Sequence, residues 1–330
     1  MTERAPRDAA FADLIDLASE RLGAVVVAAN DDFFAPKENL ITASAPRWIE
    51  GRYTDRGKWM DGWETRRRRD EGTHDWCVIR LGARGIVRGV DVETTHFKGN
   101  YPESCALDAG ELATGSEAEA HWTEILPRTP LTGDAHNRFA IDGASAATHV
   151  RLRIFPDGGV ARLRVYGEVV ADWARLRRRG EIDLAAAEHG GFVVSCSDMF
   201  FGSRNNLIMP GDATHMGDGW ETKRRRGPGH DWSLVRLAAP GTIRRVEIDT
   251  RHFKGNAPGA CDLEATADLV GRPDDERIVW RPLVDRVPLT PHAVHVFERE
   301  VRAVGDVTHV RFNIYPDGGV GRLRLFGVPR

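Results

Sequence analysis

The chain has 330 residues, of which 41% are hydrophobic and 29% are charged, and its formal net charge is −3. This length suits one large domain or two domains of ordinary size, and the near-neutral charge argues against a broad nucleic-acid-binding surface. No apolar run approaches the ~20 residues that span a bilayer, so we expect no membrane contact. The four cysteines form no Cys-x-x-Cys pair, which is typical of reduced thiols and favours a cytoplasmic location.

The N-terminal segment is predicted to be helical and to contain no targeting signal. Charges interrupt it throughout, so it lacks the apolar stretch of a signal peptide. Its apolar residues recur with a period of 3.6, and Gly23 is a natural helix stop. These apolar residues are Phe11, Leu14, Ile15, Ala18 and Leu22.

Beyond this segment, apolar and polar residues alternate, which predicts β-strands with one buried and one exposed face. Residues 149–155 place Val150, Leu152 and Ile154 on one side. Residues 161–166 alternate in the same way, and the Pro-Asp-Gly-Gly sequence between these segments predicts a hairpin turn. Strands do not alternate with helices, so we expect antiparallel sheets rather than a parallel α/β fold.

One series of motifs occurs twice along the chain in the same order. The motifs are Gly-Trp-Glu-Thr at 62–65 and 219–222, His-Asp-Trp at 74–76 and 230–232, His-Phe-Lys-Gly-Asn at 96–100 and 252–256, and Pro-Asp-Gly-Gly-Val at 156–160 and 316–320. We interpret this as an internal duplication and place one domain at residues 1–170 and a second at residues 171–330. The charged segment 171–181 predicts a linker, from which a short helix leads into the second copy. The sequence therefore predicts an all-β fold of two tandem β-sandwiches, with short helices at the N-terminus and in the linker.

The first copy contains extra residues between Ile41 and Asp61. Across this segment, the offset between the two copies falls from 167 to 157 residues. The segment is rich in glycine, proline and aromatic residues, which predicts a long loop in the first copy alone.

Polar residues that occur in both copies are the candidates for function, because packing alone explains why apolar residues recur. They are Asp61, Glu64, Thr65, Arg66, Arg67, His74, Asp75, His96, Lys98, Asn100 and Asp157, with the counterparts Asp218, Glu221, Thr222, Lys223, Arg224, His230, Asp231, His252, Lys254, Asn256 and Asp317. Arginine and lysine bind carboxylates, asparagine pairs with amide groups, and glutamate or histidine transfers protons. These residue types predict a site for a small anion that bears amide groups.

Several of these residues also have a structural interpretation. The basic run at 66–69 is typical of a solvated face, Asp157 is typical of a turn, and Trp63 is typical of a core. The adjacent residues His74 and Asp75 fit a structural pair as well as they fit a catalytic one.

The His-Phe-Lys-Gly-Asn motif is the strongest functional candidate. It follows an alternating strand, so His96 and Lys98 are expected where a buried face meets a loop. The Gly-x-Ser-x-Gly, Walker and His-Glu-x-x-His motifs are absent from the sequence. A divalent metal bound by His74, His96 and carboxylates stays open, because metal ligands need only converge in space.

Taken together, the motifs resemble those of the allantoicase family. The resemblance rests on AANDDFFAPKENL, the pair DGWETRRRR and DGWETKRRR, HDW, HFKGN and YPDGG, and it extends from about Leu14 to Gly327. It implies two tandem jelly-roll domains that are similar to galactose-binding and discoidin-type modules. It also implies a hydrolase that converts allantoate and water to ureidoglycolate and urea in purine (allantoin) degradation. Asn30 departs from the family pattern, where we expect Asp or Thr.

The resemblance carries over motifs and not residue roles, so the roles of the repeated polar residues are inferred from the chemistry of the implied reaction. The expected acid/base residues are Glu64 and His96, with the counterparts Glu221 and His252. The expected substrate-binding residues are Arg66, Lys98 and Asn100, with the counterparts Lys223, Lys254 and Asn256. Lys98 or Arg66 is expected to bind the substrate carboxylate, and Asn100 is expected to bind a ureido group.

Several questions stay open on the sequence alone. The active site can lie in one copy, in both copies or between them, and a homo-oligomer is compatible with the sequence. A non-catalytic discoidin-like tandem module that binds a carbohydrate or another ligand is the main alternative to an enzyme. Tandem repeats that only pack together are another, and a different ureido or guanidino acid is the alternative substrate.

Overall fold

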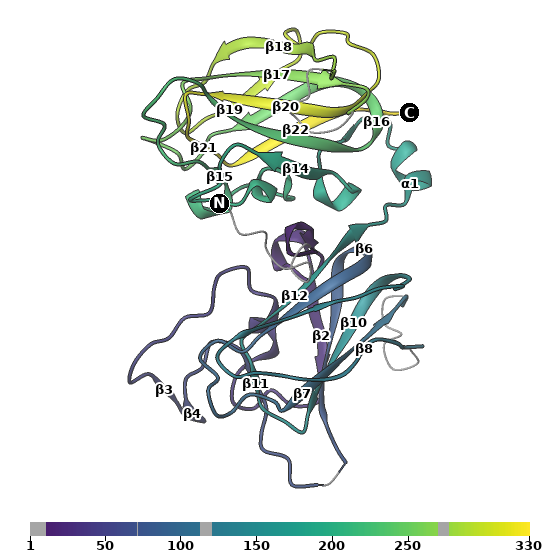
Figure 1. Cartoon of the computed structure of the whole chain (residues 1–330), viewed down its shortest axis with the longest axis vertical. Coiled ribbons are helices and arrows are strands. Elements are labelled where there is room, and N and C mark those ends of the chain that lie inside the picture. Colours follow the sequence, from purple (N-terminus) through teal and green to yellow (C-terminus); the bar gives the residue numbers. More distant parts are fainter. Residues whose placement is uncertain (1–10, 71, 113–120, 270–276) are drawn as a thin grey trace. The chain divides into compact units, whose positions relative to one another are not determined.

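The computed structural model describes residues 11–70, 72–112, 121–269 and 277–330 and contains two compact units that divide after Val170 (Figure 1). Each unit contains eight antiparallel strands connected in the same order, together with a small two-stranded sheet. The predicted all-β fold of two tandem sandwiches is confirmed. The short helix predicted in the linker is also confirmed, as α1 (Trp173–Arg177), in which the Asp172 side chain accepts a hydrogen bond from the backbone of Arg175.

The two units contain corresponding elements. The strands of the first unit are β1 (Ile15–Asp16), β2 (Val25–Ala29), β3 (Tyr53–Thr54), β4 (Gly57–Lys58), β5 (Trp63–Glu64), β6 (Asp75–Glu93), β7 (Ser104–Gly110), β8 (Thr123–Pro130), β9 (His136–Ala140), β10 (Ala146–Phe155), β11 (Gly159–Val160) and β12 (Arg162–Val169). The strands of the second unit are β13 (Ile182–Asp183), β14 (Phe192–Cys196), β15 (Trp220–Glu221), β16 (Asp231–Asp249), β17 (Ala260–Thr266), β18 (Arg281–Pro288), β19 (Val294–Phe297), β20 (Val307–Tyr315), β21 (Gly319–Val320) and β22 (Arg322–Pro329). Short 3-10 helices are η2 (Glu20–Leu22), η3 (Lys37–Ile41), η5 (Ala187–His189), η6 (Arg204–Ile208) and η7 (Met216–Asp218).

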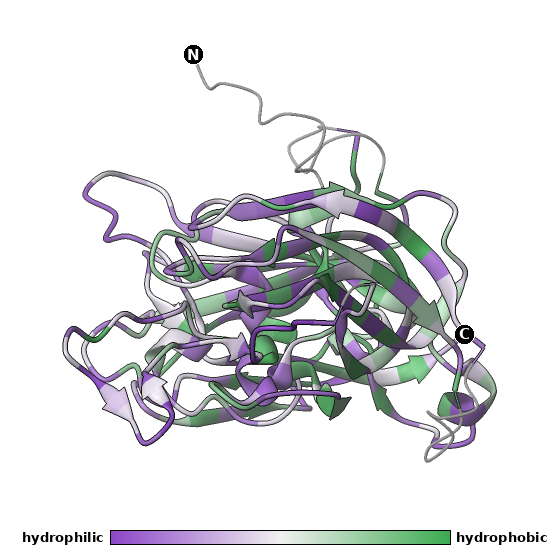
Figure 2. Cartoon of the chain, turned by 90° about the horizontal axis from the view of Figure 1, so that it is seen from below, coloured by the Kyte–Doolittle hydropathy of each residue, from purple (hydrophilic) through white to green (hydrophobic). Residues whose placement is uncertain are grey.

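The 19-residue strand β6 organises the first unit. Its first part pairs with β10 and β2, and its last part pairs with β12 and β9. The strand β16 makes the corresponding pairs in the second unit. Hydrophobic and hydrophilic bands alternate along strands in Figure 2, as expected of strands with one buried face. Side chains such as Ile79, Leu152 and Leu163 are completely buried and form the core of the first unit.

The predicted hairpin between the two alternating segments is wrong. The strands β10 and β12 do not pair with each other, because each pairs with a different part of β6. The Pro-Asp-Gly-Gly turn leads instead into β11, where Gly159 and Val160 pair with Glu64 and Trp63 of β5. The turn thereby holds the Gly-Trp-Glu-Thr motif in place.

The N-terminal helix predicted from the 3.6-residue period is replaced by short 3-10 turns on either side of a strand. Residues 11–13 and η2 are 3-10, and between them Ile15 and Asp16 form β1, which pairs with β12. The Asp16 carboxylate accepts a hydrogen bond from the backbone of Val165, so this segment bonds to the sheet rather than to itself. Its apolar residues are still largely buried, against strands rather than as one face of a helix. Residues 1–10 lie outside the described residues.

All four cysteines are free, and Cys77, Cys105 and Cys261 are buried. Each helix in the described part of the chain is too short or too polar to cross a membrane.

The turn after β10 packs tightly on the loop that follows β6. Gly159 lies so close to the Phe97 ring that a Cβ atom on it would lie 2.0 Å from Cε1 of that ring. The Gly159 backbone N–H also donates to the carbonyl oxygen of Asn100 at 2.7 Å. The second unit repeats this contact, with the same 2.0 Å between a Cβ on Gly319 and the Phe253 ring. Glycine is therefore required at these two positions by a close approach.

We expect Gly159→Ala and Gly319→Ala each to lower the free energy of unfolding by about 1–3 kcal/mol, because overpacking forces a buried ring to move. The measurement is the urea midpoint of each purified variant. Gly227→Ala is the matched control, since a Cβ there would meet nothing within 4 Å. Equal midpoints for all three variants would contradict the close contact.

Candidate active site

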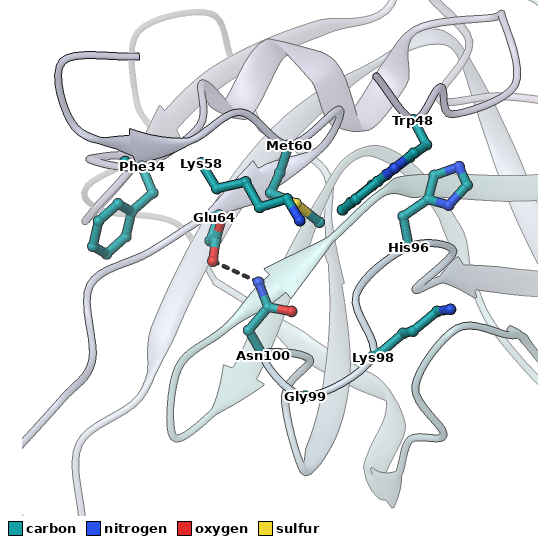
Figure 3. Close-up of a pocket in the computed structure, with 10 residues that line it drawn as sticks. Phe34, Trp48, Lys58, Met60, Glu64, His96, Lys98, Gly99 and Asn100 are labelled. Carbon is teal, nitrogen blue, oxygen red and sulfur yellow. Dashed lines mark hydrogen bonds between the residues drawn. The ribbon is translucent and has the colours of Figure 1, made fainter. Parts of the chain in front are cut away.

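A cavity of about 830 Å³ opens in the first unit between a loop, a short strand and the extra segment of the first copy (Figure 3). We call this extra segment, residues 42–60, the insert. It is mostly loop, as predicted, with the small hairpin β3–β4 near its end. The cavity is lined by Phe34, Trp48, Gly57, Lys58, Met60, Glu64, His96, Lys98, Gly99 and Asn100.

The structure brings four of the predicted site residues of the first unit to this cavity. They are Glu64, His96, Lys98 and Asn100. The strand β5 presents Glu64, and Trp63 beside it is completely buried, as its core interpretation predicted. The Trp63 indole donates to the carbonyl oxygen of Asp31 at 2.8 Å, which fixes the strand.

Glu64 and Asn100 form a hydrogen-bonded pair on the wall of the cavity (Figure 3). The Asn100 side-chain amide donates to Oε1 of Glu64 at 2.7 Å. Burial raises the pKa of Glu64 above its usual value, and the hydrogen bond from Asn100 partly opposes that shift. Glu64 therefore holds a proton at a higher pH than an exposed glutamate, as a general acid requires.

His96 has a strained backbone. Its φ is 70°, in the left-handed region that residues other than glycine rarely adopt, and His252 has a φ of 72°. The backbone N–H of His96 donates to Oδ1 of Asp134 at 2.8 Å, which holds this conformation. The His96 ring centroid lies 5.8 Å from that of Trp48. Strained residues of this kind occur preferentially at functional sites, so the conformation supports a role for His96.

The two cations predicted to bind a carboxylate are placed differently. Lys98 lines the cavity, but its side chain is 78% exposed and its Nζ lies 3.8 Å from a carboxylate oxygen of Asp134. Arg66 lies outside this cavity, and its Nε donates to Asp31 at 2.7 Å. Arg66 lines an adjoining cavity together with the other arginines of the basic run. Glu64 lines both cavities.

The remaining repeated polar residues of the first unit have structural partners. Asp75 is buried and accepts hydrogen bonds from Arg68 and Asn30 rather than pairing with His74. The Asp157 carboxylate accepts a hydrogen bond from the backbone of Arg68, as expected of a turn residue. The basic run is therefore only partly a solvated face.

His74 does not line the cavity, and its ring packs on Phe155 at 5.0 Å between centroids. Burial, with a smaller effect of Arg153, lowers the pKa of His74. Within the described residues, histidine, cysteine, aspartate and glutamate side chains form no group of three suited to a metal ion. The described geometry thus gives no support to a metal bound jointly by His74 and His96.

The second unit keeps half of this arrangement. The Asn256 amide donates to Oε1 of Glu221 at 2.5 Å, as in the first unit. The His252 ring, in contrast, lies 2.9 Å from the carbonyl oxygen of Ala213 and is hydrogen-bonded to it. Lys223 pairs with Asp198 at 3.2 Å. The predicted residues of the second unit, including Lys254, do not line the cavity described above.

Sequence reasoning missed four side chains of the cavity. They are Phe34, Trp48, Lys58 and Met60. Three of them belong to or end the insert, which has no equivalent in the second copy. The signal that could have identified them is the insert itself, because it is the one place where the two copies differ strongly in length.

Comparisons with known proteins show the family to which the chain belongs. The family model described as the allantoicase repeat matches residues 15–170 and again residues 182–330. A probable allantoicase from Burkholderia mallei is 49% identical over 318 residues, which cover 95% of this chain and 94% of that protein. A probable allantoicase from Pseudomonas aeruginosa is also 49% identical, with 98% of each chain covered.

The crystal structure of allantoicase from Saccharomyces cerevisiae superposes with a TM-score of 0.81 at 34% identity, covering 95% of this chain and 92% of that one. A second allantoicase structure gives a TM-score of 0.82 at 34% identity, with 96% of this chain and 93% of that chain covered. The repeated match to the family model, the full-length relatives and these structures lead to one conclusion: the chain belongs to the allantoicase family.

Proposed function

We propose that the chain converts allantoate and water to ureidoglycolate and urea, and that the cavity of the first unit is its active site. Membership of the allantoicase family makes the chain a hydrolase of purine degradation. The observation that carries the location is the half-buried Glu64, paired with Asn100, in the same cavity as the strained His96.

The substrate sets the requirements of the site. Allantoate has a tetrahedral carbon that carries one carboxylate and two ureido groups. Release of urea breaks the bond between this carbon and one ureido nitrogen, which departs only if it is protonated. The remaining ureido nitrogen donates its electron pair to the carbon, and water then adds to the acyl-imine-like intermediate. The site must therefore supply an acid, a base and groups that bind amides.

In our proposal, Glu64 donates the proton to the departing nitrogen, since burial raises its pKa. His96 accepts the proton that the attacking water loses. The reaction therefore takes one proton from Glu64 and returns one proton to His96. Asn100 binds a ureido group with the part of its amide that does not pair with Glu64. Figure 3 shows the Asn100 oxygen pointing away from Glu64, where it is available to a ureido N–H.

We assign catalysis to the first unit rather than the second. In the second unit, the counterpart of His96 already donates a hydrogen bond from Nε2 to the Ala213 carbonyl oxygen, and the Asn256 amide nitrogen lies 3.8 Å from the sulfur of Met216. Those contacts occupy groups that substrate would need. We further propose that the chain acts in the cytoplasm, which its four free cysteines support.

Replacement of the proposed general acid tests which of the two units is catalytic. We expect Glu64→Gln to lower kcat for urea release by roughly 10²–10⁴-fold, the usual contribution of a general acid. The matched variant Glu221→Gln should stay within a few-fold of wild type. The measurement is urea release from allantoate by purified protein, with and without a chelator. A large loss in Glu221→Gln with normal activity in Glu64→Gln would move the active site to the second unit.

The pH dependence tests the protonation state of Glu64. The hydrogen bond from Asn100 favours the ionised form of Glu64, so Asn100→Ala should raise the pKa of Glu64 further. For a general acid, the alkaline limb of the kcat/KM profile then moves to higher pH. We expect Asn256→Ala to leave that limb in place. A limb that stays fixed in Asn100→Ala, or moves to lower pH, is incompatible with Glu64 as the acid.

A further inference from the structure

The insert supplies one side of the cavity, and only the first unit has it. Its residues Trp48 and Lys58, with Met60 at its end, face the wall that carries Glu64 and Asn100 (Figure 3). The corresponding segment of the second unit is ten residues shorter, and it contains no tryptophan or lysine that could replace Trp48 or Lys58. A difference between the two units in what they bind should therefore originate in the insert.

The hairpin β3–β4 holds the backbone of Lys58 in place. Lys58 pairs with Tyr53 across the hairpin β3–β4, and the backbone of Trp59 donates to the carbonyl oxygen of Arg52 at 3.0 Å. The Arg56 side chain ties the hairpin to the carbonyl oxygen of Phe33 at 2.9 Å. These bonds fix where the Lys58 side chain starts.

The Lys58 ammonium lies against the Trp48 ring, 4.0 Å from the ring centroid. The Trp48 indole is itself held by a hydrogen bond of 2.8 Å to the Glu50 carboxylate. In Figure 3 the Lys58 nitrogen lies between the Trp48 ring and the pair formed by Glu64 and Asn100. The cation is thus on the side of the cavity that holds the proposed acid.

Lys58 is also the lysine of the cavity whose charge is not already compensated. It forms no ion pair with any residue in the described ranges, whereas Lys98 lies 3.8 Å from an Asp134 oxygen and points away from the Glu64 side in Figure 3. A cation that faces a cavity without a carboxylate partner is a site for an anionic group of a ligand. The carboxylate of a ureido acid has the required charge and size.

We propose that Lys58 binds the carboxylate of the substrate and makes the first unit selective for acids that carry a ureido group on the carbon next to the carboxylate. This inference rests on the proposed function. The carboxylate and the departing nitrogen are attached to the same carbon, so an ion pair at Lys58 fixes that carbon relative to Glu64. The insert then explains why a duplicated scaffold has one substrate site in its first unit.

Two unreactive inhibitors test this assignment. Ureidoacetate has a ureido group and a carboxylate on one carbon, and ureidoacetamide has a neutral amide in place of that carboxylate. Wild-type protein should bind the acid more tightly than the amide, as measured by their inhibition constants against allantoate. In Lys58→Met this preference should fall by roughly 10–100-fold, the loss of a hydrogen bond between charged groups. Binding of the amide should change little, and Lys58→Arg should keep most of the preference.

The competing variant is Lys98→Met, which should keep the preference for the acid. If Lys58→Met keeps the preference, or if Lys98→Met loses it instead, the assignment to Lys58 is overturned. If Lys58 only supports the fold, Lys58→Met weakens both inhibitors equally, which also overturns it. Failure of the proposed function looks different, because wild-type protein would then release no urea from allantoate whatever the inhibitors do.

Discussion

The contact between the Phe97 ring and Gly159 is the constraint on which the candidate site depends. The ring is completely buried, and the space beside it admits no Cβ atom. The contact joins the loop that carries His96 and Asn100 to the turn that leads into β11. Because β11 pairs with β5, the same contact sets the position of Glu64. Three motifs that are far apart in the sequence are therefore held together by one piece of packing.

This packing also explains why the motifs are repeated. The second unit makes the same contact between Phe253 and Gly319, and it keeps the hydrogen bond between Asn256 and Glu221. The repeated motifs therefore indicate a shared scaffold and do not by themselves indicate shared chemistry. The first unit has the insert, whereas in the second unit the His252 ring is hydrogen-bonded to a backbone carbonyl. We infer that the unrepeated part of the sequence carries the specificity.

The sequence predicted the fold class well because a two-residue alternation survives in strands whatever their partners are. It did not predict which strands pair with each other. The 19-residue strand β6 pairs with β10 along its first part and with β12 along its last part, and alternation of apolar and polar residues carries no information about such pairing. It also failed on the N-terminal helix, where the carboxylate of Asp16 bonds to the sheet. The motif residues Glu64 and His96 line the candidate cavity, while Lys58 lies in the two-residue strand β4 of the insert, outside any repeated motif. Such a short strand in a long insert leaves no periodic signal, so only the folded structure reveals which of its side chains reach a cavity.

A substrate carboxylate bound at Lys58 has a consequence for the proton on Glu64. Burial already raises the pKa of Glu64, and a ligand in the cavity displaces water and adds a second negative charge nearby. Both effects disfavour the ionised carboxylate, so on our proposal substrate binding raises that pKa further. The ion pair with Lys58 limits the like-charge repulsion without removing the effect of burial. Glu64 then keeps its proton until the departing nitrogen accepts it, which ties the order of proton transfer to the binding of an anion.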